Sequence, residues 1–303
     1  MSTTALSLFD AYAAHYARSG ALPTGLCGLD RLLSGGLCCG EVVELCGLAG
    51  CGAQLVALSA ACATVLRRPG DTALYLCTTL DAFAVRACAL LRGTVRAYAG
   101  GGGDAAAAAD AAARALRFAT ALDWPRLQRA LDGLERALEG AGEGGGGAAA
   151  PPAALAPFLR GLRLLVVDSI SQVVAPILGG KGNSKGHFAL SDCGARLHRL
   201  AKRHGLAVLV LNTATLDRSE APAAGEGAAG GPLRPSLGPT WSFVPDVSLL
   251  VVSSREGGRD VISTAVLKSG RPYLGALDSE DAAPEALRWG AAPAGKGGGG
   301  GVQ

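Results

Sequence analysis

Short apolar runs that alternate with helical patterns constrain this chain more than any other feature of its sequence. Four runs, rich in Val and Leu, are EVVELCG (41–47), TALYLCT (72–78), LRLLVVD (162–168) and LAVLVLNT (206–213). Runs of this length are typical of strands that are buried on both faces. Helical patterns follow at 52–68, 81–92 and 189–205. The sequence therefore predicts an α/β fold, with a mostly parallel central sheet and helices on both faces.

Further elements complete this prediction. We expect a third strand at 115–122 and then a helix at 123–140, with a proline in its first turn. Two alternating segments, VSLLVVSS (247–254) and DVISTAVLKS (260–269), flank a Gly-Gly pair and predict an antiparallel C-terminal edge hairpin. Low-complexity segments at about 99–113 and 139–157 are expected to be insertions that lengthen loops. The alanine run in the first could also be a helix, although little marks an apolar face on it.

Composition excludes several classes of protein. The net charge of +3 is too small to indicate nucleic-acid binding through overall charge. The nine cysteines are odd in number and show no C-x-x-C pair, which favours structural thiols over disulfides or zinc. No apolar run approaches the ~20 residues of a membrane span, so we expect no membrane partner.

A glycine-rich loop follows the first strand, in the stretch VELCGLAGCGAQLVAL (43–58). Its outer glycines have the spacing of a phosphate-binding loop, G-x-x-x-x-G-K-[ST], but Ala53 replaces the lysine and Gln54 the magnesium-binding hydroxyl. The stretch is thus either a nucleotide site without its chemistry or a simple glycine turn. A later strand ends in Asp168, as the magnesium-positioning strand does in P-loop proteins, and this order favours the nucleotide site.

Five longer stretches extend the pattern: residues 22–47, 164–180, 199–215, 233–251 and 266–272. They resemble the RecA-type recombinase core, especially that of the eukaryotic strand-exchange recombinase paralogues, and among these the D-type paralogue. LGPTWSFVP (237–245) is the part least expected in an unrelated ATPase. The resemblance implies a RecA-like P-loop core over 22–285 and a flexible tail over 286–303. It also implies a linker helix over 1–21, without the small N-terminal helical domain of the family.

Members of that family bind ATP between neighbouring subunits. The resemblance assigns to the degenerate nucleotide site Gly47, Leu48, Ala49, Gly50, Cys51, Gly52, Ala53, Gln54, Asp168 and Asn212. Asp168 would position magnesium through the nucleotide, and Asn212 would sense the nucleotide state. Thr79 stands where the family has the glutamate that orients the attacking water, and Asp81 lies two residues later. We therefore expect no catalytic residue and little or no hydrolysis in cis. Whether ATP and magnesium bind in cis stays open, and weak binding is the most that we expect.

Two loops of the family contact single-stranded DNA. The first corresponds to about 177–187 and offers Lys181, Lys185 and His187. The second corresponds to about 213–237 and offers Arg218 and Arg234, although nearby acidic residues nearly cancel its charge. Cations in flexible loops bind phosphates without regard to base sequence. The alternative is that both loops are simply solvated.

Other positions allow two interpretations each. Phe9 and Tyr12 lie on the linker helix and are expected to dock on a neighbouring subunit. Lys268 either approaches a neighbour's nucleotide or is an exposed lysine at a strand end. The stretch HRLAKRH (198–204) is either a solvated helix face or a binding patch. Trp241 and Phe243 are expected to anchor a core or an interface rather than to stack on bases.

The sequence leads to one hypothesis of function and two alternatives. By resemblance, the chain would be a non-catalytic or weakly catalytic subunit of a complex with other recombinase paralogues, in the nucleus. It would support homologous recombination DNA repair by assisting the strand-exchange recombinase on single-stranded DNA. The first alternative is an active DNA-stimulated ATPase of the same family. The second is a decayed P-loop scaffold with protein interactions only.

Overall fold

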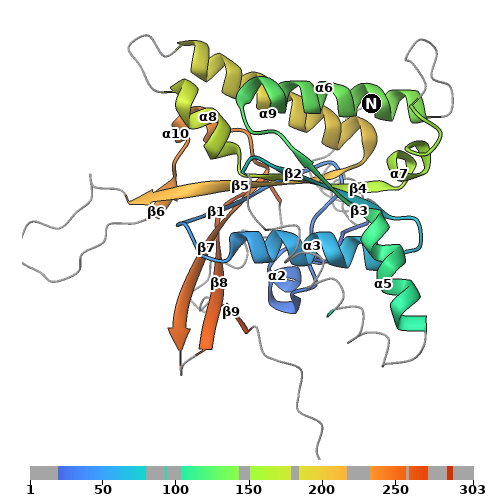
Figure 1. The fold of residues 1–303 in the computed structure, drawn as a ribbon. Helices are drawn as coiled ribbons and strands as arrows, with labels where there is room; N and C mark the ends of the chain where they lie inside the picture. The colour runs from blue at the N-terminus through green and yellow to red at the C-terminus, as the bar shows by residue number, and fades with distance from the viewer. Residues whose placement is uncertain are drawn as a thin grey trace, which may run out of the picture.

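The computed structural model describes residues 20–79, 93, 104–142, 151–178, 184–216, 233–256, 259–271 and 285–288. Within them a single sheet holds nine strands. Eight follow the order β3-β2-β4-β5-β1-β7-β8-β9, and β6 pairs with β5. Figure 1 shows this sheet between two layers of helices. The arrangement confirms the predicted fold class, an α/β domain with a mostly parallel sheet.

The apolar runs form the centre of the sheet. The parallel strands are β1 Val42–Gly47, β2 Thr72–Cys77, β3 Leu116–Thr120, β4 Leu162–Asp168 and β5 Ala207–Leu216. All six residues of β1 are buried, because β1 lies between β5 and β7 and helices cover both of its faces. Since these strands run in the same direction, their carboxyl ends meet at a single edge of the sheet.

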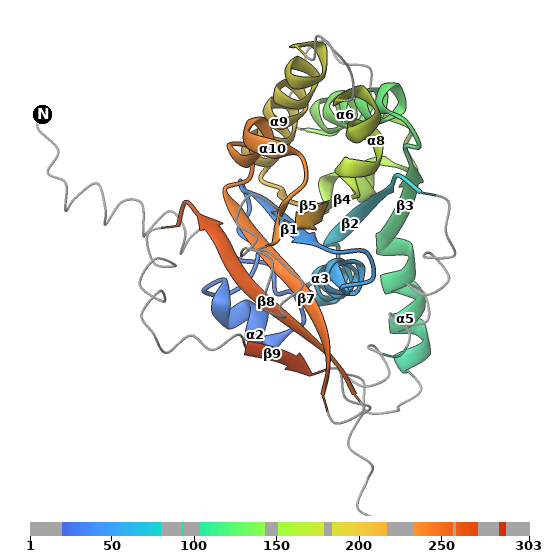
Figure 2. The same ribbon diagram turned by 90° about the vertical axis from the view of Figure 1, so that its left-hand side faces the viewer.

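The other side of the sheet ends in antiparallel pairs, although the first strand there, β7, still pairs in parallel with β1. β7 (Val247–Glu256) and β8 (Arg259–Ser269) form the predicted hairpin, and β9 (Glu285–Arg288) adds to the outer side of β8. Figure 2 shows this long pair running past α2 and α3. The short β6 (Leu233–Pro235) pairs with the end of β5 and was not predicted, because three residues give no alternation to recognise.

Helices cover the two faces as two separate layers. One layer contains α2 (Cys27–Leu32), α3 (Ala53–Arg67) and α5 (Asp104–Ala115). The other contains α6 (Trp124–Ala141), α7 (Ala156–Arg160), α8 (Ile170–Leu178), α9 (Ser184–His204) and α10 (Gly238–Ser242). Alternate residues of the strands enter the two cores: Leu45 packs toward α3, whereas Val42 packs toward α9. Among the described residues, no helix is both long and apolar enough to cross a membrane.

Part of the alanine-rich segment is a helix, the alternative that the sequence allowed beside a loop insertion. Residues 104–115 form α5, and Ala112 is buried in the core cluster that contains α3. Alanine side chains are short, so they let two helices approach closely while adding little amphipathic pattern to the sequence. In the second expected insertion, α6 extends to Ala141 and α7 begins at Ala156, while 143–150 lies outside the described residues.

A buried ion pair fastens the opposite, amino-terminal edge of the sheet. Arg271 Nη2 lies 2.7 Å from Glu41 Oε2, and both side chains are almost fully buried. The same guanidinium donates to the carbonyl oxygens of Leu33 and Gly36 in the turn after α2. Arg271 therefore joins three segments that are distant in sequence: this turn, the start of β1 and the end of β8.

We predict that Arg271→Met lowers the free energy of unfolding by about 3–5 kcal/mol, because it leaves a buried carboxylate without its partner. Urea unfolding followed by circular dichroism measures the loss. Arg126→Met is the matched control, since Arg126 forms an exposed pair with Asp123 at 3.3 Å and should cost at most about 1 kcal/mol. Equal losses in the two variants would contradict the structural role of Arg271.

Candidate nucleotide site

The glycine loop leaves the sheet at the carboxyl end of β1 and leads directly into α3. Leu48, Ala49 and Gly50 are exposed, whereas Cys51 is buried beneath them. A side chain at Gly47 would collide with Cys51 Sγ and would lie 2.6 Å from the carbonyl oxygen of Val251. Gly52 has φ +90° and sits against Ile262. Packing alone therefore requires these two glycines, so they do not by themselves demonstrate a ligand.

Gln54, in the first turn of α3, reaches across to the end of β4. Its Nε2 donates to Asp168 Oδ2 at 2.8 Å, and Tyr75 Oη on β2 donates to the same oxygen at 2.9 Å. Tyr75 is fully buried and Asp168 is 6% exposed. The structure thus brings the glycine loop and the predicted strand-end carboxylate together. It also shows what the sequence did not, namely that a side-chain N–H group contacts the carboxylate directly.

Thr78 fixes the end of β4 against β2. Its Oγ1 donates to the carbonyl oxygen of Asp168 at 2.9 Å and accepts from the backbone N–H of Ser169 at 2.8 Å. The next residue, Thr79, is exposed and offers a hydroxyl where the family has a carboxylate. Asp81 lies outside the described residues. The described part of this site therefore holds neither the phosphate lysine nor a carboxylate that could orient water.

The side chain of Asn212, on β5, contacts a different polar cluster from that of the glycine loop, and its role toward a nucleotide stays a prediction. Its Nδ2 donates to Glu44 Oε1 at 2.8 Å, and its Oδ1 accepts from Ser236 Oγ at 3.1 Å. Glu44 lies on the face of β1 that packs toward α9 and α10, opposite α3. A shift of one residue along a strand reverses the face that a side chain occupies. The residue of β5 that pairs in register with Gly47 is Thr213, which sequence reasoning had not assigned to the site.

Glu44 is the centre of a second, fully buried polar cluster. Trp241 Nε1 donates to its Oε1 at 2.7 Å, and Ser248 Oγ donates to its Oε2. With the bond from Asn212, three neutral donors surround one carboxylate that is 1% exposed. Trp241 is fully buried and anchors the core, one of the two roles expected of it. Phe243 is 82% exposed, so it does not anchor the core, and its role at an interface stays a prediction.

The predicted DNA-contacting residues are placed only in part. Lys185 and His187 lie in the first turn of α9, which begins at Ser184, so they are helical rather than part of a loop. Both are exposed, and His187 Nδ1 shares a hydrogen bond with Thr240 Oγ1 of α10 at 2.8 Å. Arg234 lies exposed on β6. Lys181, Arg218, Phe9 and Tyr12 lie outside the described residues.

Sequence reasoning missed an exposed ring beside the first DNA loop. Phe188 follows His187 on α9 and is 75% exposed. Figure 1 shows α8, α10 and β6 at one end of the molecule, where the glycine loop also enters α3. An aromatic side chain that directly follows a predicted cationic loop was the available signal. The helix predicted at 189–205 begins one residue after Phe188, so the ring was not assigned to a helix face.

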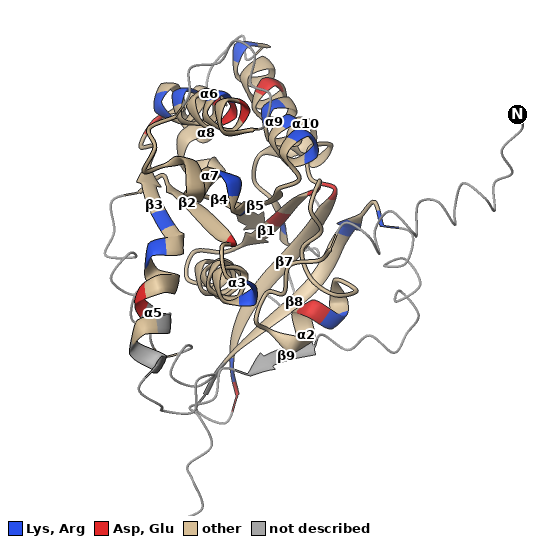
Figure 3. Cartoon of the chain, turned by 90° about the vertical axis from the view of Figure 1, so that its right-hand side faces the viewer, with Lys and Arg blue, Asp and Glu red and all other residues tan. Residues whose placement is uncertain are grey.

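Two ambiguous groups of cations have partners within the described chain. Lys268 Nζ donates to the carbonyl oxygens of Ser242 and Pro245 at 2.8 and 2.6 Å, so it stabilises the end of α10. Arg199 Nε lies 3.3 Å from Glu135 Oε1 on α6. Figure 3 shows blue (Lys, Arg) and red (Asp, Glu) positions interspersed along the ribbons of α6 and α9. This pairing favours a solvated, ion-paired face over a binding patch at 198–204.

The cysteines near the site are structural thiols. Burial raises the pKa of Cys46 to about 12, with Glu44 and Cys51 adding to the effect, and burial also raises the pKa of Cys51. A thiol with such a pKa stays protonated at neutral pH and is a poor nucleophile or metal ligand. Consistently, no group of three His, Cys, Asp or Glu residues suited to a metal occurs in the described ranges.

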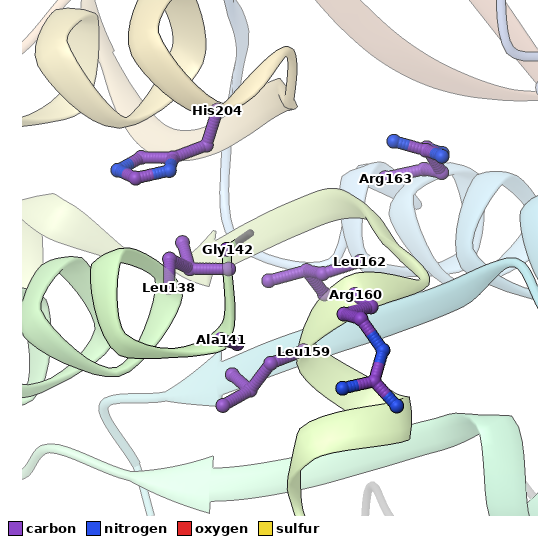
Figure 4. Close-up of a pocket in the computed structure, with 8 residues that line it drawn as sticks. All are labelled: Leu138, Ala141, Gly142, Leu159, Arg160, Leu162, Arg163 and His204. Atoms are coloured by element: carbon purple, nitrogen blue, oxygen red, sulfur yellow. The ribbon is translucent and has the colours of Figure 1, made fainter. Parts of the chain in front are cut away.

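A hollow of about 310 Å³ lies at the other end of β4. Figure 4 shows its lining, with Leu138, Leu159 and Leu162 as an apolar floor and His204 at one side. The guanidinium groups of Arg160 and Arg163 point away from each other, and Arg163 Nε lies 3.5 Å from Asp71. The charged groups do not converge, so this hollow lacks the arrangement of a binding site.

The chain resembles several known DNA repair proteins. It is 31% identical over 237 residues to the DNA repair protein RAD51 homolog 4 of Bos taurus, covering 78% of this chain. It is 28% identical over 278 residues to the protein of the same name from Mus musculus, covering 87% of this chain and 74% of the mouse protein. A shorter match, 28% over 94 residues, is to the probable DNA repair protein RAD51 homolog 4 of Dictyostelium discoideum, covering 31% of this chain and 23% of that protein.

The match spans 63% of the bovine protein, less than two thirds of its length. No protein-family model matches the chain.

We predict that two substitutions of Glu44 differ sharply in their effect on stability. Glu44→Leu should lower the free energy of unfolding by about 3 kcal/mol or more, because three buried donors lose their acceptor. Glu44→Gln should cost within about 1 kcal/mol, since its oxygen accepts from Asn212 and Trp241 while its amide donates to Ser248 Oγ. Thermal and urea unfolding measure both values. Similar losses for the two variants would show that the negative charge itself is required.

Proposed function

The similarity to the RAD51 homologues supports a RAD51/RecA-family paralogue, and on that premise we propose that the chain is a non-catalytic subunit of a recombinase-paralogue complex. In this role it supports homologous recombination repair by assisting the strand-exchange recombinase on single-stranded DNA. The relatives share the name RAD51 homolog 4, which supports a place near the D-type paralogue. The proposed location, the nucleus, follows from this role in DNA repair.

A single observation carries the non-catalytic part of the proposal. Gln54 donates to the carboxylate of Asp168 at 2.8 Å, where a catalytic loop would place a metal-binding hydroxyl, and Ala53 replaces the phosphate lysine. Phosphoryl transfer depends almost wholly on positioning and charge neutralisation. Each lost preorganised contact typically lowers the rate roughly hundredfold. Loss of the lysine, the hydroxyl and the glutamate together leaves no effective catalyst in this chain.

Nucleotide in such a complex would be held chiefly by the glycine loop of a neighbouring subunit. Phe9 and Tyr12, on the linker helix that the sequence predicts, are proposed to dock on a partner, because the apolar stripe of such a helix would require cover. Any binding of ATP in cis would rest on backbone N–H groups and the start of α3, a 15-residue helix.

The proposed contact with single-stranded DNA rests on the end of the molecule that carries α9 and β6. Lys185 and Arg234 are exposed cations there, and Phe188 is an exposed ring. Cations that track phosphates and rings that stack on bases are the usual components of sequence-independent binding. A protein that uses only a few phosphate contacts should bind weakly and lose affinity as salt rises.

The test is ATP turnover by the chain in complex with its paralogue partners, with and without single-stranded DNA. Asp168→Asn is the variant of choice, because its amide oxygen still accepts from Gln54 and Tyr75 and preserves the local structure. We expect turnover to change by less than about twofold, since a neighbour carries the chemistry, whereas the same change in that neighbour should cost roughly hundredfold. A tenfold loss through this chain would instead favour the DNA-stimulated ATPase.

Titration of single-stranded DNA into the same complex at two salt concentrations distinguishes the proposed function from the scaffold alternative. The proposal requires binding that weakens with salt and that Phe188→Ala reduces. Ser184→Ala, one turn before Phe188 on α9, is the matched control and should have little effect. If the complex assembles but neither Lys185→Ala nor Phe188→Ala lowers its affinity for DNA, the result would favour a scaffold with protein interactions only.

A further inference from the structure

We propose that this site excludes the divalent cation altogether, and that Gln54 takes the structural place of the ion by joining α3 to β4. The inference rests on the proposed function, because it assumes that the loop descends from a nucleotide site. Beyond the proposed function, it gives Gln54 a structural role, which the loss of catalysis alone would not explain.

The first step is chemical. Magnesium demands near-octahedral coordination by oxygen atoms and is usually held by carboxylates, hydroxyls, phosphates and water. The group that faces Asp168 Oδ2 is the Nε2 amide of Gln54, a hydrogen-bond donor that cannot be a ligand. An ionised carboxylate has no proton to donate, so only the nitrogen end of the amide can face it. The residues present therefore do not fit the ion that the family uses.

The second step is geometric. Tyr75 Oη donates to the same oxygen as Gln54, at 2.9 Å. Tyr75 is fully buried and packs against Phe118 with ring centroids 5.5 Å apart, so the phenol cannot move aside freely. An ion at this oxygen would have to displace both donors. The loop offers no compensating lysine, because position 53 is alanine.

The third step concerns what the contact does. Gln54 is half-buried in the first turn of α3, and Asp168 is the last residue of β4. The two strands that lead to them, β1 and β4, are not neighbours, because β5 lies between them. The Gln54–Asp168 bond therefore links non-adjacent strands across the carboxyl edge. In a catalytic P-loop protein the metal and its nucleotide make this link, whereas here the chain makes it without a ligand.

Melting temperatures of the full chain test the proposal in four solutions: EDTA, MgCl2, ATP with EDTA, and ATP with MgCl2. The melting temperature of the unaltered chain in ATP with MgCl2 should exceed that in ATP with EDTA by less than about 1 °C. Gln54→Leu should lower the melting temperature by roughly 3–10 °C in every solution, because a hydrogen bond to a charged group is lost. Gln128→Leu is the matched control. Gln128 is also a half-buried glutamine in a helix, but it makes no such bond, so this variant should change the melting temperature by less than about 2 °C.

A converse variant makes the test two-sided. Ala53→Lys with Gln54→Thr recreates the complete loop sequence, so ATP with MgCl2, but not ATP with EDTA, should raise its melting temperature by roughly 5–10 °C at saturating ligand. If the double variant folds poorly, the melting temperatures of Gln54→Thr alone are measured in the same solutions.

Two results would overturn the proposal. One is a magnesium-dependent rise in the unaltered chain, and the other is a loss in Gln54→Leu no larger than that in Gln128→Leu. Either result would leave the non-catalytic role standing, because that role is judged by turnover and not by melting temperature.

Discussion

Neighbouring residues of a β-strand point to opposite faces of the sheet, and this alternation decides which polar groups meet at its carboxyl edge. Asp168 shares a face with α3 and therefore contacts Gln54. Glu44 and Asn212 share the other face with α10 and therefore contact Trp241 and Ser236. The same edge thus carries two separate polar clusters. Only the cluster beside α3 lies where a nucleotide loop would need it.

The glycine loop keeps its shape for reasons that do not require a ligand. Gly47 has no room for a side chain beside Cys51, and Gly52 adopts a backbone conformation that favours glycine. Gln54 then fastens the start of α3 to the end of β4. A chain that retains this framework can keep the surface of a RecA-like subunit, including any contacts with partners and DNA, after the groups that drive hydrolysis are gone. The proposed role follows because the fold can be kept while the groups that drive hydrolysis are absent.

Much of the fold was predictable because long apolar runs and a Gly-Gly hairpin leave few alternatives, and β1, β4, β5 and the β7–β8 pair all lie where the sequence placed them. The glycine loop and Asp168 were also paired correctly, since strand order brings both to one edge. The sequence could not reveal which donor meets Asp168, because that depends on the reach of one side chain. It could not show that Asn212 contacts Glu44 rather than the glycine loop, because the face of a strand residue depends on where the strand begins. It missed β6 because three residues carry no period, and it missed Phe188 because the predicted helix began one residue later.

In this structure the amide of Gln54 holds the carboxylate of Asp168, at which a metal would otherwise bind. A crystal structure of the chain grown with manganese and a non-hydrolysable ATP analogue measures this most directly, because manganese can be located by its anomalous scattering. We predict that Gln54 Nε2 lies within hydrogen-bonding distance of Asp168, near 2.8 Å, and that no anomalous peak lies beside that carboxylate. A manganese ion bound to Asp168, with the Gln54 side chain turned away, would contradict it.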